Sequence, residues 1–296
     1  MKRKSTKQVA WENSMNLLFF LCGIITVGFV LCISVYLVIS GIPAIAEIGI
    51  GDFFLGKVWK PTATTVEPSY GILPFLLTSI YGTAGAVVLG IPVGLLTAVY
   101  LAKLAPPKIA AVIRTAVQLL AGIPSVVYGL VGMIVLVPAI RKAFGLSSGA
   151  CLLAAIVVLA IMILPSIINV AETSLRAVPR EYEEASLALG ATEIETYFRV
   201  SLPAASSGVA TAVVLGVGRA IGEAMAIIMV AGNVANMPGL FTSVRFLTTA
   251  IASEMSYAAY GSLHRNALYS IGLVLFLFIM LINVLLNVFI KNKKED

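Results

Sequence analysis

The chain of 296 residues has few charged, histidine, cysteine or tryptophan residues. Asp, Glu, Lys and Arg together make up 11% of it, whereas they reach about 25% in soluble domains. Apolar residues make up 59%, and the mean hydropathy is +1.02. These values exclude an ordinary soluble domain and indicate an integral membrane protein.

The scarcity of cysteine and histidine limits the chemistry. Cys22, Cys32 and Cys151 all fall in apolar stretches, so we expect packed or lipid-facing thiols and no disulfide framework. His264 has no cluster of potential ligands around it, and we expect a solvated loop histidine rather than a metal site. No nucleophile, metal cluster or cofactor motif gathers on one face, so the chain is not expected to be an enzyme.

A nucleotide site is also not expected. The stretch 51–58 fits seven positions of a phosphate-binding P-loop, but Val58 stands where a Ser or Thr must hold magnesium. We therefore expect the chain to have no cofactor of its own, and any ATP to be used by a partner ATPase.

Long apolar runs predict about six membrane-spanning helices, since a helix needs about 20 apolar residues to cross the hydrocarbon layer. The predicted spans are 16–40, 72–101, 109–138, 150–170, 206–232 and 267–290. Gly122 and Pro124 interrupt the third span and predict a break or kink there. The first apolar run is longer than the roughly 7–15 residues of a signal peptide core, so a retained anchor is expected.

The distribution of Lys and Arg predicts the orientation, because basic residues near span ends stay in the cytoplasm. With both termini inside, thirteen basic residues are cytoplasmic and six are external, with Arg219 left inside a span. The net charge of +6 thus reflects topology and not nucleic-acid binding. The predicted parts are a cytoplasmic segment 1–15, the first helix 16–40, an external loop 41–71, a core 72–290 with a cytoplasmic loop 171–205, and a tail 291–296.

The cytoplasmic loop carries signals for two short helices. Pro179 suits a first turn, Gly190 suits a left-handed helix end, and Thr192 with Glu195 predicts a capping box at the start of the second helix. The two helices would form a rigid knob on the cytoplasmic surface.

The same loop resembles the EAA loop of ABC importer permeases. The matching positions are Glu184, Ala185, Ser186, Gly190, Val200, Leu202 and Pro203. Ser186 replaces an alanine of that pattern and Val200 an isoleucine. The resemblance implies an all-α, type I importer (MetI-like) permease fold, in which this loop couples to a dimer of separate ATPase subunits.

The stretch 216–233, GVGRAIGEAMAIIMVAGN, carries two charges in an apolar segment. Arg219 lies 13 residues from either end of the predicted span 206–232. Glu223 follows four residues later, so both side chains are expected on one helix face toward the bundle interior or a water-filled pathway. Two interpretations stay open: a structural ion pair that clamps helices, or a pathway for an oxyanion, which arginine binds through its planar fork.

Glycine pairs occur beside these charges at Gly218 and Gly222, and in the second span at Gly90 and Gly94. Such spacing lets helix backbones approach closely, and ordinary helix packing is the expected role.

Residues 218–233 also resemble the PstC-type permeases of the phosphate-specific transport system, as do AGIPSVVYGLVG at 121–132 and WKP at 59–61. Ala224 stands where that family usually has threonine. The resemblance implies transport of inorganic phosphate across a bacterial or archaeal cell membrane. The implied partners are a sister permease, the ATPase dimer and an external phosphate-binding protein, which would dock on loops 41–71 and 233–266.

Several alternatives stay open. Permeases for sulfate, molybdate or phosphonate share the coupling loop, and the PstA-type sister permease is similar in outline. A channel or proton-coupled carrier could also place Arg219 and Glu223 in a pathway, but it would have no use for the EAA loop and would work without ATP.

Overall fold

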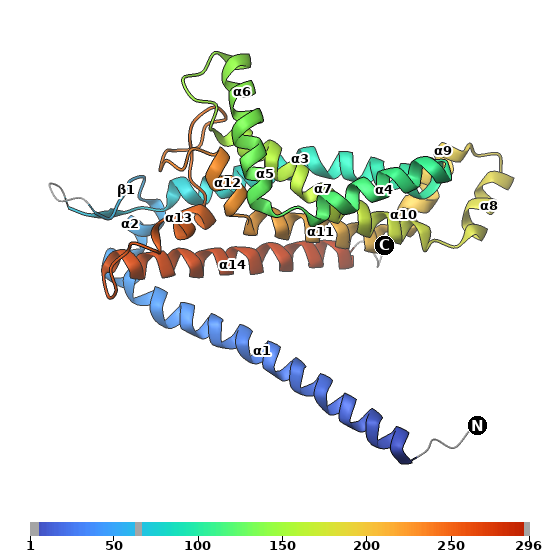
Figure 1. Cartoon of the computed structure of the whole chain (residues 1–296), viewed down its shortest axis with the longest axis horizontal. Coiled ribbons are helices and arrows are strands. Elements are labelled where there is room, and N and C mark those ends of the chain that lie inside the picture. Colours follow the sequence, from blue (N-terminus) through green and yellow to red (C-terminus); the bar gives the residue numbers. More distant parts are fainter. Residues whose placement is uncertain (1–5, 63–66, 293–296) are drawn as a thin grey trace.

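The computed structural model describes residues 6–62 and 67–292 (Figure 1). The predicted segments 1–15 and 291–296 lie partly outside these residues, with Lys2, Arg3, Lys4, Lys293 and Lys294 among them. Within this part of the chain, regular structure is helical except for a two-stranded antiparallel ribbon of β1 (Trp59–Lys60) and β2 (Ser69–Tyr70).

Within the described residues, five helical segments are long and apolar enough to cross a membrane. They are α1 (Thr6–Ile48), α3 (Leu73–Val99) with the π-helical η1 (Tyr100–Leu104), the run α5 (Ser125–Val131), η2 (Gly132–Leu136) and α6 (Val137–Phe144), then α7 (Leu152–Arg176) and α14 (Leu263–Asn292). A sixth is formed if the segment Glu193–Ala204 and α11 (Ser206–Gly222), which meet at a bend of 75°, are counted together as one broken span. This confirms the predicted all-α membrane fold.

Of the remaining helices, α4 (Pro107–Gly122) has 16 residues and the others are shorter. The shorter ones are α2 (Ile50–Leu55), α8 (Arg180–Ala188), α9 (Glu193–Thr196), η3 (Tyr197–Ser201), α10 (Leu202–Ala204), α12 (Met225–Val230) and α13 (Leu247–Glu254).

Helix α7 is the centre of the bundle and packs between α3 and α11. Its Ile163 and Ile167 are fully buried. A Cβ added at Gly90 would lie 2.7 Å from Cδ1 of Ile163, and one added at Gly94 would lie 2.8 Å from Cγ2 of Ile167. The expected packing role of this glycine pair is therefore confirmed, because the missing side chains let α3 and α7 approach.

The third predicted span, 109–138, is not one helix. Helix α4 ends at Gly122, Ile123 is extended (φ −70°, ψ 127°), and α5 begins only at Ser125. Pro124 explains the break, because its ring disfavours helical backbone in the preceding residue. The segment with the length and hydropathy of a span is Ser125–Phe144, which begins well after the predicted start.

Helix α1 is longer than the predicted 16–40 and lies apart from the bundle along most of its length (Figure 1). It contacts α14 near its C-terminal end, where the rings of Tyr36 and Tyr269 lie 5.4 Å apart. There the hydroxyl of Ser270 also donates to the Gly41 carbonyl at 2.6 Å. The start of the predicted loop 41–71 is therefore helical.

Candidate functional site

The loop between α7 and α11 forms the expected knob of two short helices. Gly190 has φ 87°, in the left-handed region that glycine adopts without a steric penalty, directly after α8. The capping box is present: the Glu195 N–H donates to the Thr192 hydroxyl at 3.3 Å, and the Thr192 N–H donates to the Glu195 carboxylate at 3.1 Å. The hydrogen bonds from the backbone and hydroxyl of Thr192 lower the pKa of the Glu195 carboxyl.

Glu183 ties the knob to the helix bundle, a role that the sequence pattern did not reveal. Its carboxylate is paired with the ammonium of Lys103 in η1, which continues α3, and accepts a 2.7 Å hydrogen bond from the Ser201 hydroxyl. The hydroxyls of Ser186 and Thr196 join α8 to α9 at 2.9 Å. A force on the knob would therefore reach both α3 and the segment that leads into α11.

The outer face of the knob exposes large apolar side chains. Leu189 is 90% exposed, Ile194 61% and Tyr182 54%. Glu184, Ala185, Gly190 and Pro203 are exposed, and Ser186, Val200 and Leu202 are half-buried. Exposed apolar groups of this size on a polar loop are typical of a protein-binding surface. The knob lies at the end of the molecule opposite β1 and α13 (Figure 1).

Arg219 and Glu223 do not share a helix face, contrary to the prediction. Helix α11 ends at Gly222, Glu223 is extended (φ −73°, ψ 132°), and α12 begins at Met225. Arg219 thus lies in the last turn of α11, where a helix dipole favours a cation. The predicted continuous helix 206–232 is wrong, because the chain leaves the helical conformation at Glu223.

Glu223 is held by two groups at this break. Its carboxylate accepts a 3.0 Å hydrogen bond from the Ala226 N–H and so caps the first turn of α12. Its carbonyl accepts a 2.7 Å hydrogen bond from the Thr248 hydroxyl of α13. Hydrogen bonds to both the side chain and the backbone of Glu223 therefore stabilise the break.

Arg219 is half-buried and has only a weak polar contact. Its guanidinium donates to the Ser166 hydroxyl of α7 at 3.5 Å. Among the described residues, no carboxylate lies within ion-pair distance of it, Glu223 included. The ion-pair interpretation is therefore wrong for Arg219 with Glu223 in this structure.

The glycine pair Gly218 and Gly222 also differs from its expected role. A Cβ added at either position would have no neighbour within 4 Å in this chain. The helix face beside Arg219 is therefore open, whereas the Gly90 and Gly94 face is filled.

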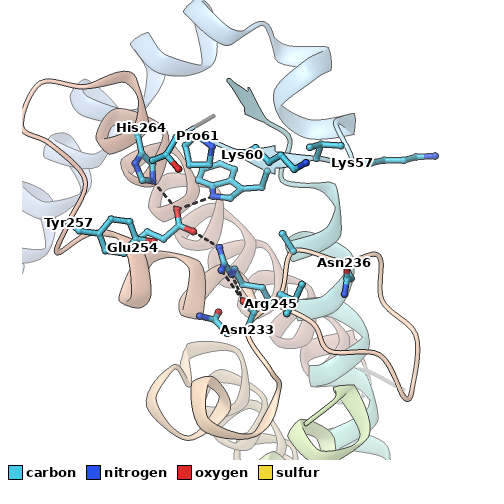
Figure 2. Close-up of a pocket in the computed structure, with 14 residues that line it drawn as sticks. Lys57, Lys60, Pro61, Asn233, Asn236, Arg245, Glu254, Tyr257 and His264 are labelled. Atoms are coloured by element: carbon cyan, nitrogen blue, oxygen red, sulfur yellow. Dashed lines mark hydrogen bonds and ion pairs between the residues drawn. The ribbon is translucent and has the colours of Figure 1, made fainter. Parts of the chain in front are cut away.

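A second charged cluster lies at the opposite end from the knob, around Glu254 (Figure 2). Its carboxylate accepts hydrogen bonds from Trp59 Nε1 at 2.9 Å and from Arg245, and its Oε2 lies 2.8 Å from His264 Nε2. His264 is buried and bonded, so the expectation of a solvated loop histidine is wrong. Trp59 and Glu254 are 195 residues apart, which is why the sequence pattern gave no signal for this cluster.

Comparison with known proteins gives the family. The family model described as "Binding-protein-dependent transport system inner membrane component" matches residues 90–293. A probable ABC transporter permease, YqgH of Bacillus subtilis, is 38% identical, with 89% of this chain and 87% of that protein aligned. The phosphate transport system permease PstC of Haemophilus influenzae is 34% identical, with 89% and 88% aligned.

Solved structures agree on the fold. The MetNI methionine ABC transporter in an inward-facing conformation has a chain with a TM-score of 0.60 and 22% identity, covering 75% of this chain and 95% of that one. A chain of a bacterial alginate ABC transporter also gives a TM-score of 0.60, with 16% identity and 95% of both chains covered. These likenesses confirm the expected type of permease fold.

The alignment of 89% of the chain with the permease relatives, the broken membrane helices and the exposed double-helix knob agree with one another. The chain is a multi-pass membrane transport subunit and not itself an enzyme; the ATPase of such a system is a separate subunit. The chain therefore belongs to the family of binding-protein-dependent transport system inner membrane components, the permeases of ABC transporters.

Proposed function

We propose that this permease carries inorganic phosphate into the cytoplasm, with Arg219 as the anion-binding group of the pathway. Relatives with 28–34% identity, from Haemophilus influenzae to Methanocaldococcus jannaschii, are named as phosphate permeases of the PstC type. The name of the YqgH relative specifies no substrate. The family likeness therefore supports phosphate among the oxyanions, and the site chemistry supplies the second argument.

The observation that carries the proposal is Arg219, which lies beside the break in a membrane helix and has no carboxylate partner among the described residues. A charged side chain inside the membrane costs about 2.5–3.5 kcal/mol on insertion scales, so such residues usually mark a pathway. Interrupted helices are typical of transporter substrate sites. A guanidinium without a carboxylate partner keeps its planar fork free for two hydrogen bonds to a phosphate edge.

Glu223 favours hydrogen phosphate over sulfate in this proposal. One oxygen of the Glu223 carboxylate accepts a hydrogen bond from the Ala226 N–H, at the break that follows the last turn of α11, the turn that carries Arg219. Hydrogen phosphate offers a hydroxyl that a carboxylate oxygen can accept, whereas sulfate at neutral pH has no such donor. The same negative charge would weaken the hold of Arg219 enough for the anion to leave.

The knob would receive the ATPase in the cytoplasm. Its exposed Leu189 and Ile194 suit an apolar groove on a partner, and Glu184, Ala185 and Ser186 lie on the same loop. ATP-driven closure of the two ATPase subunits would move the knob. The Glu183 pairing with Lys103, together with the continuous chain through Pro203, would pass this movement to α3 and α11.

The proposed assembly has this chain beside a sister permease, with the ATPase dimer inside and a phosphate-binding protein outside. Both termini would be cytoplasmic, as the distribution of Lys and Arg predicts. The open Gly218 and Gly222 face suits the approach of a helix from the sister permease.

The test is uptake of radiolabelled phosphate into proteoliposomes that hold the whole complex, with ATP inside and the binding protein outside. We expect uptake that requires ATP and resists excess sulfate or molybdate. Inhibition of uptake by sulfate would show that the proposed substrate has to be changed to another oxyanion. Uptake without ATP would favour a channel or carrier. A complex with Leu189→Glu should lose uptake together with stimulated ATP hydrolysis, while Lys142→Glu, an exposed charge change on α6 away from the knob, should retain both.

A further inference from the structure

Two arginines and one glutamate form a cluster where η1, α4 and α7 meet. Helix α4 lies in the half of the bundle that carries the knob (Figure 1). Arg114 belongs to α4, and Glu172 and Arg176 belong to the end of α7. Nε of Arg114 and of Arg176 donates to the same Glu172 oxygen, at 2.6 and 2.9 Å. One Nη atom of each also donates to the Leu101 carbonyl, at 3.2 and 2.9 Å.

This cluster carries more positive than negative charge. Two guanidinium groups share one carboxylate, and Nη1 of each arginine forms no hydrogen bond within the described residues. The two arginine side chains are partly exposed, whereas Glu172 is buried, so a group that approaches from outside meets the cations. Guanidinium groups bind phosphate oxygens through their planar set of N–H donors. The cluster therefore favours a phosphate anion.

An apolar groove of about 430 Å³ opens further along α7. Its walls come from the end of α4, the break at Ile123, the run from α5 to α6, and the part of α7 around Ile161. The one side-chain hydroxyl in the lining, that of Tyr128, already donates to the Leu120 carbonyl at 2.7 Å. The groove therefore suits a hydrocarbon group.

The arginine cluster and the groove lie on one face of α7. Ile161, Ile168 and Glu172 are spaced by seven and four residues, which places their side chains on one side of a helix. Between the two sites, Ile168 packs against Val117 of α4. Ile161 and Glu172 are about 16 Å apart along the helix axis. That separation is close to the hydrocarbon thickness of one leaflet, about 15 Å or half of the bilayer core.

We infer that this face of α7 binds an anionic phospholipid, with its phosphate on Arg114 and Arg176 and an acyl chain in the groove. A phospholipid carries a phosphate and a hydrocarbon chain at about this separation, whereas a free phosphate ion leaves the groove unfilled. Basic pockets between helices on the cytoplasmic side are typical sites for anionic headgroups. The inference takes the knob end as cytoplasmic, as in the proposed function, but does not depend on which anion is transported.

The groove differs from the face where the sister permease is proposed to approach. Helix α11 packs on Ile163 and Ile167, which lie on the side of α7 away from the groove. A lipid at the arginine cluster has a consequence for the knob. Leu101 and Lys103 both belong to η1, and Lys103 pairs with Glu183 of the knob, so the bound headgroup would brace the base of the knob.

The experiment measures lipid binding to the whole complex. The complex is placed in nanodiscs of phosphatidylcholine with an increasing share of phosphatidylglycerol, and the bound phosphatidylglycerol is counted by native mass spectrometry. Arg176→Gln should weaken phosphatidylglycerol binding about fivefold, because the attraction of one basic residue for an anionic headgroup is lost. Arg114 remains to pair with Glu172, so the fold is retained. The matched control is Arg180→Gln, an exposed basic residue at the start of α8, which should bind as the wild type does.

A second variant tests the groove without a change of charge. Ile161→Trp fills the groove from an exposed position and should also weaken phosphatidylglycerol binding. Its control is Val112→Trp, on the exposed face of α4 outside the groove, which should leave binding unchanged. Wild-type affinity for phosphatidylglycerol in both Arg176→Gln and Ile161→Trp would overturn the inference.

Two further outcomes would identify a different occupant and so contradict the inference. Radiolabelled phosphate that binds the complex in neutral nanodiscs, is lost in Arg176→Gln and is kept in Ile161→Trp would make the cluster an ion site. Loss of the sister chain from the Ile161→Trp complex, with phosphatidylglycerol binding unchanged, would make the groove a subunit interface. Either result can occur whether or not the complex carries phosphate, so failure of the inference is distinct from failure of the proposed function.

Discussion

Glu254 and Arg219 are both charged groups in largely apolar surroundings, but the fold satisfies one and leaves the other open. The side chain of Glu254 is 5% exposed and is bound by an arginine, a tryptophan and a histidine from three other parts of the chain. Arg219 is half-buried with one 3.5 Å contact to a serine. A charged group bound by several partners holds elements of the fold together. A charged group without an ionic partner is available to a ligand.

Glu172, on α7, lies between these extremes. Its buried carboxylate accepts hydrogen bonds from Arg114 at 2.6 Å and Arg176 at 2.9 Å, and both arginines also donate to the Leu101 carbonyl. The arginine side chains are 33% and 48% exposed. We therefore expect removal of these charges to lower stability most at Glu254, less at Glu172 and not at Arg219.

The largest effect on stability is expected for Glu254→Gln. Loss of the carboxylate leaves Arg245 and His264 buried without their anionic partner, and breaking a buried pair costs about 3–5 kcal/mol. Chemical unfolding of the purified complex measures it. The exposed Glu47→Gln serves as the control and should stay within about 0.5 kcal/mol. If Glu254→Gln were as stable as this control, the cluster would not be a structural joint.

Glu172→Gln should destabilise less. Arg114 and Arg176 can rehydrate when the carboxylate is lost, so we expect about 1.5–3 kcal/mol, the range for hydrogen bonds to charged groups. The same unfolding measurement applies. If Glu172→Gln lost as much unfolding free energy as Glu254→Gln, the exposure of the arginine partners would not determine the size of the loss.

The two glycine pairs give a further contrast. Gly90→Ala forces a Cβ against Ile163 and should cost about 1–3 kcal/mol by overpacking. Gly218→Ala meets open space and should gain about 0.5–1 kcal/mol from helix propensity in the isolated chain. Unfolding of the isolated chain in detergent checks both. Loss of complex assembly in Gly218→Ala alone would show that another subunit packs on that face.

The smallest effect is a pH response of the knob. Because the folded-state pKa of Glu195 is lowered, its contribution to stability is fully present above the ordinary value of about 4.3 and is lost as the pH falls through the lowered folded-state pKa. The Glu195 amide should therefore be protected from hydrogen exchange at pH 7 and progressively less protected in an acid titration below the ordinary value, after correction for the intrinsic rate. Glu195→Gln should remove this dependence while keeping a capping partner; an unchanged pH dependence in that variant would contradict the assignment.

Local signals in the sequence predicted the knob well. Gly190 and the Thr192–Glu195 capping box were visible because each depends on neighbours within a few residues. The packing of Gly90 and Gly94 and the break near Pro124 were predicted for the same reason. These features follow from steric and hydrogen-bonding rules that act over one or two helical turns.

Two features of the site could not be predicted in this way. The break at Glu223 lies in an apolar stretch without proline, and it depends on Thr248, 25 residues further along the chain. The Glu254 cluster joins Trp59 to His264 and Arg245 across most of the sequence. Contacts of this kind depend on how the helices are arranged, and hydropathy and spacing do not encode that arrangement in a readable form.

The most direct test of the account is phosphate uptake by complexes with Arg219→Gln and Arg219→Lys, measured beside assembly, thermal stability and basal ATP hydrolysis. We expect both variants to assemble with unchanged stability and basal hydrolysis, because Arg219 holds no ion pair in the described structure. Uptake should be lost in Arg219→Gln and strongly reduced in Arg219→Lys, which lacks the bidentate fork. Normal uptake in Arg219→Gln would contradict the account and leave Arg219 without a role in anion transport.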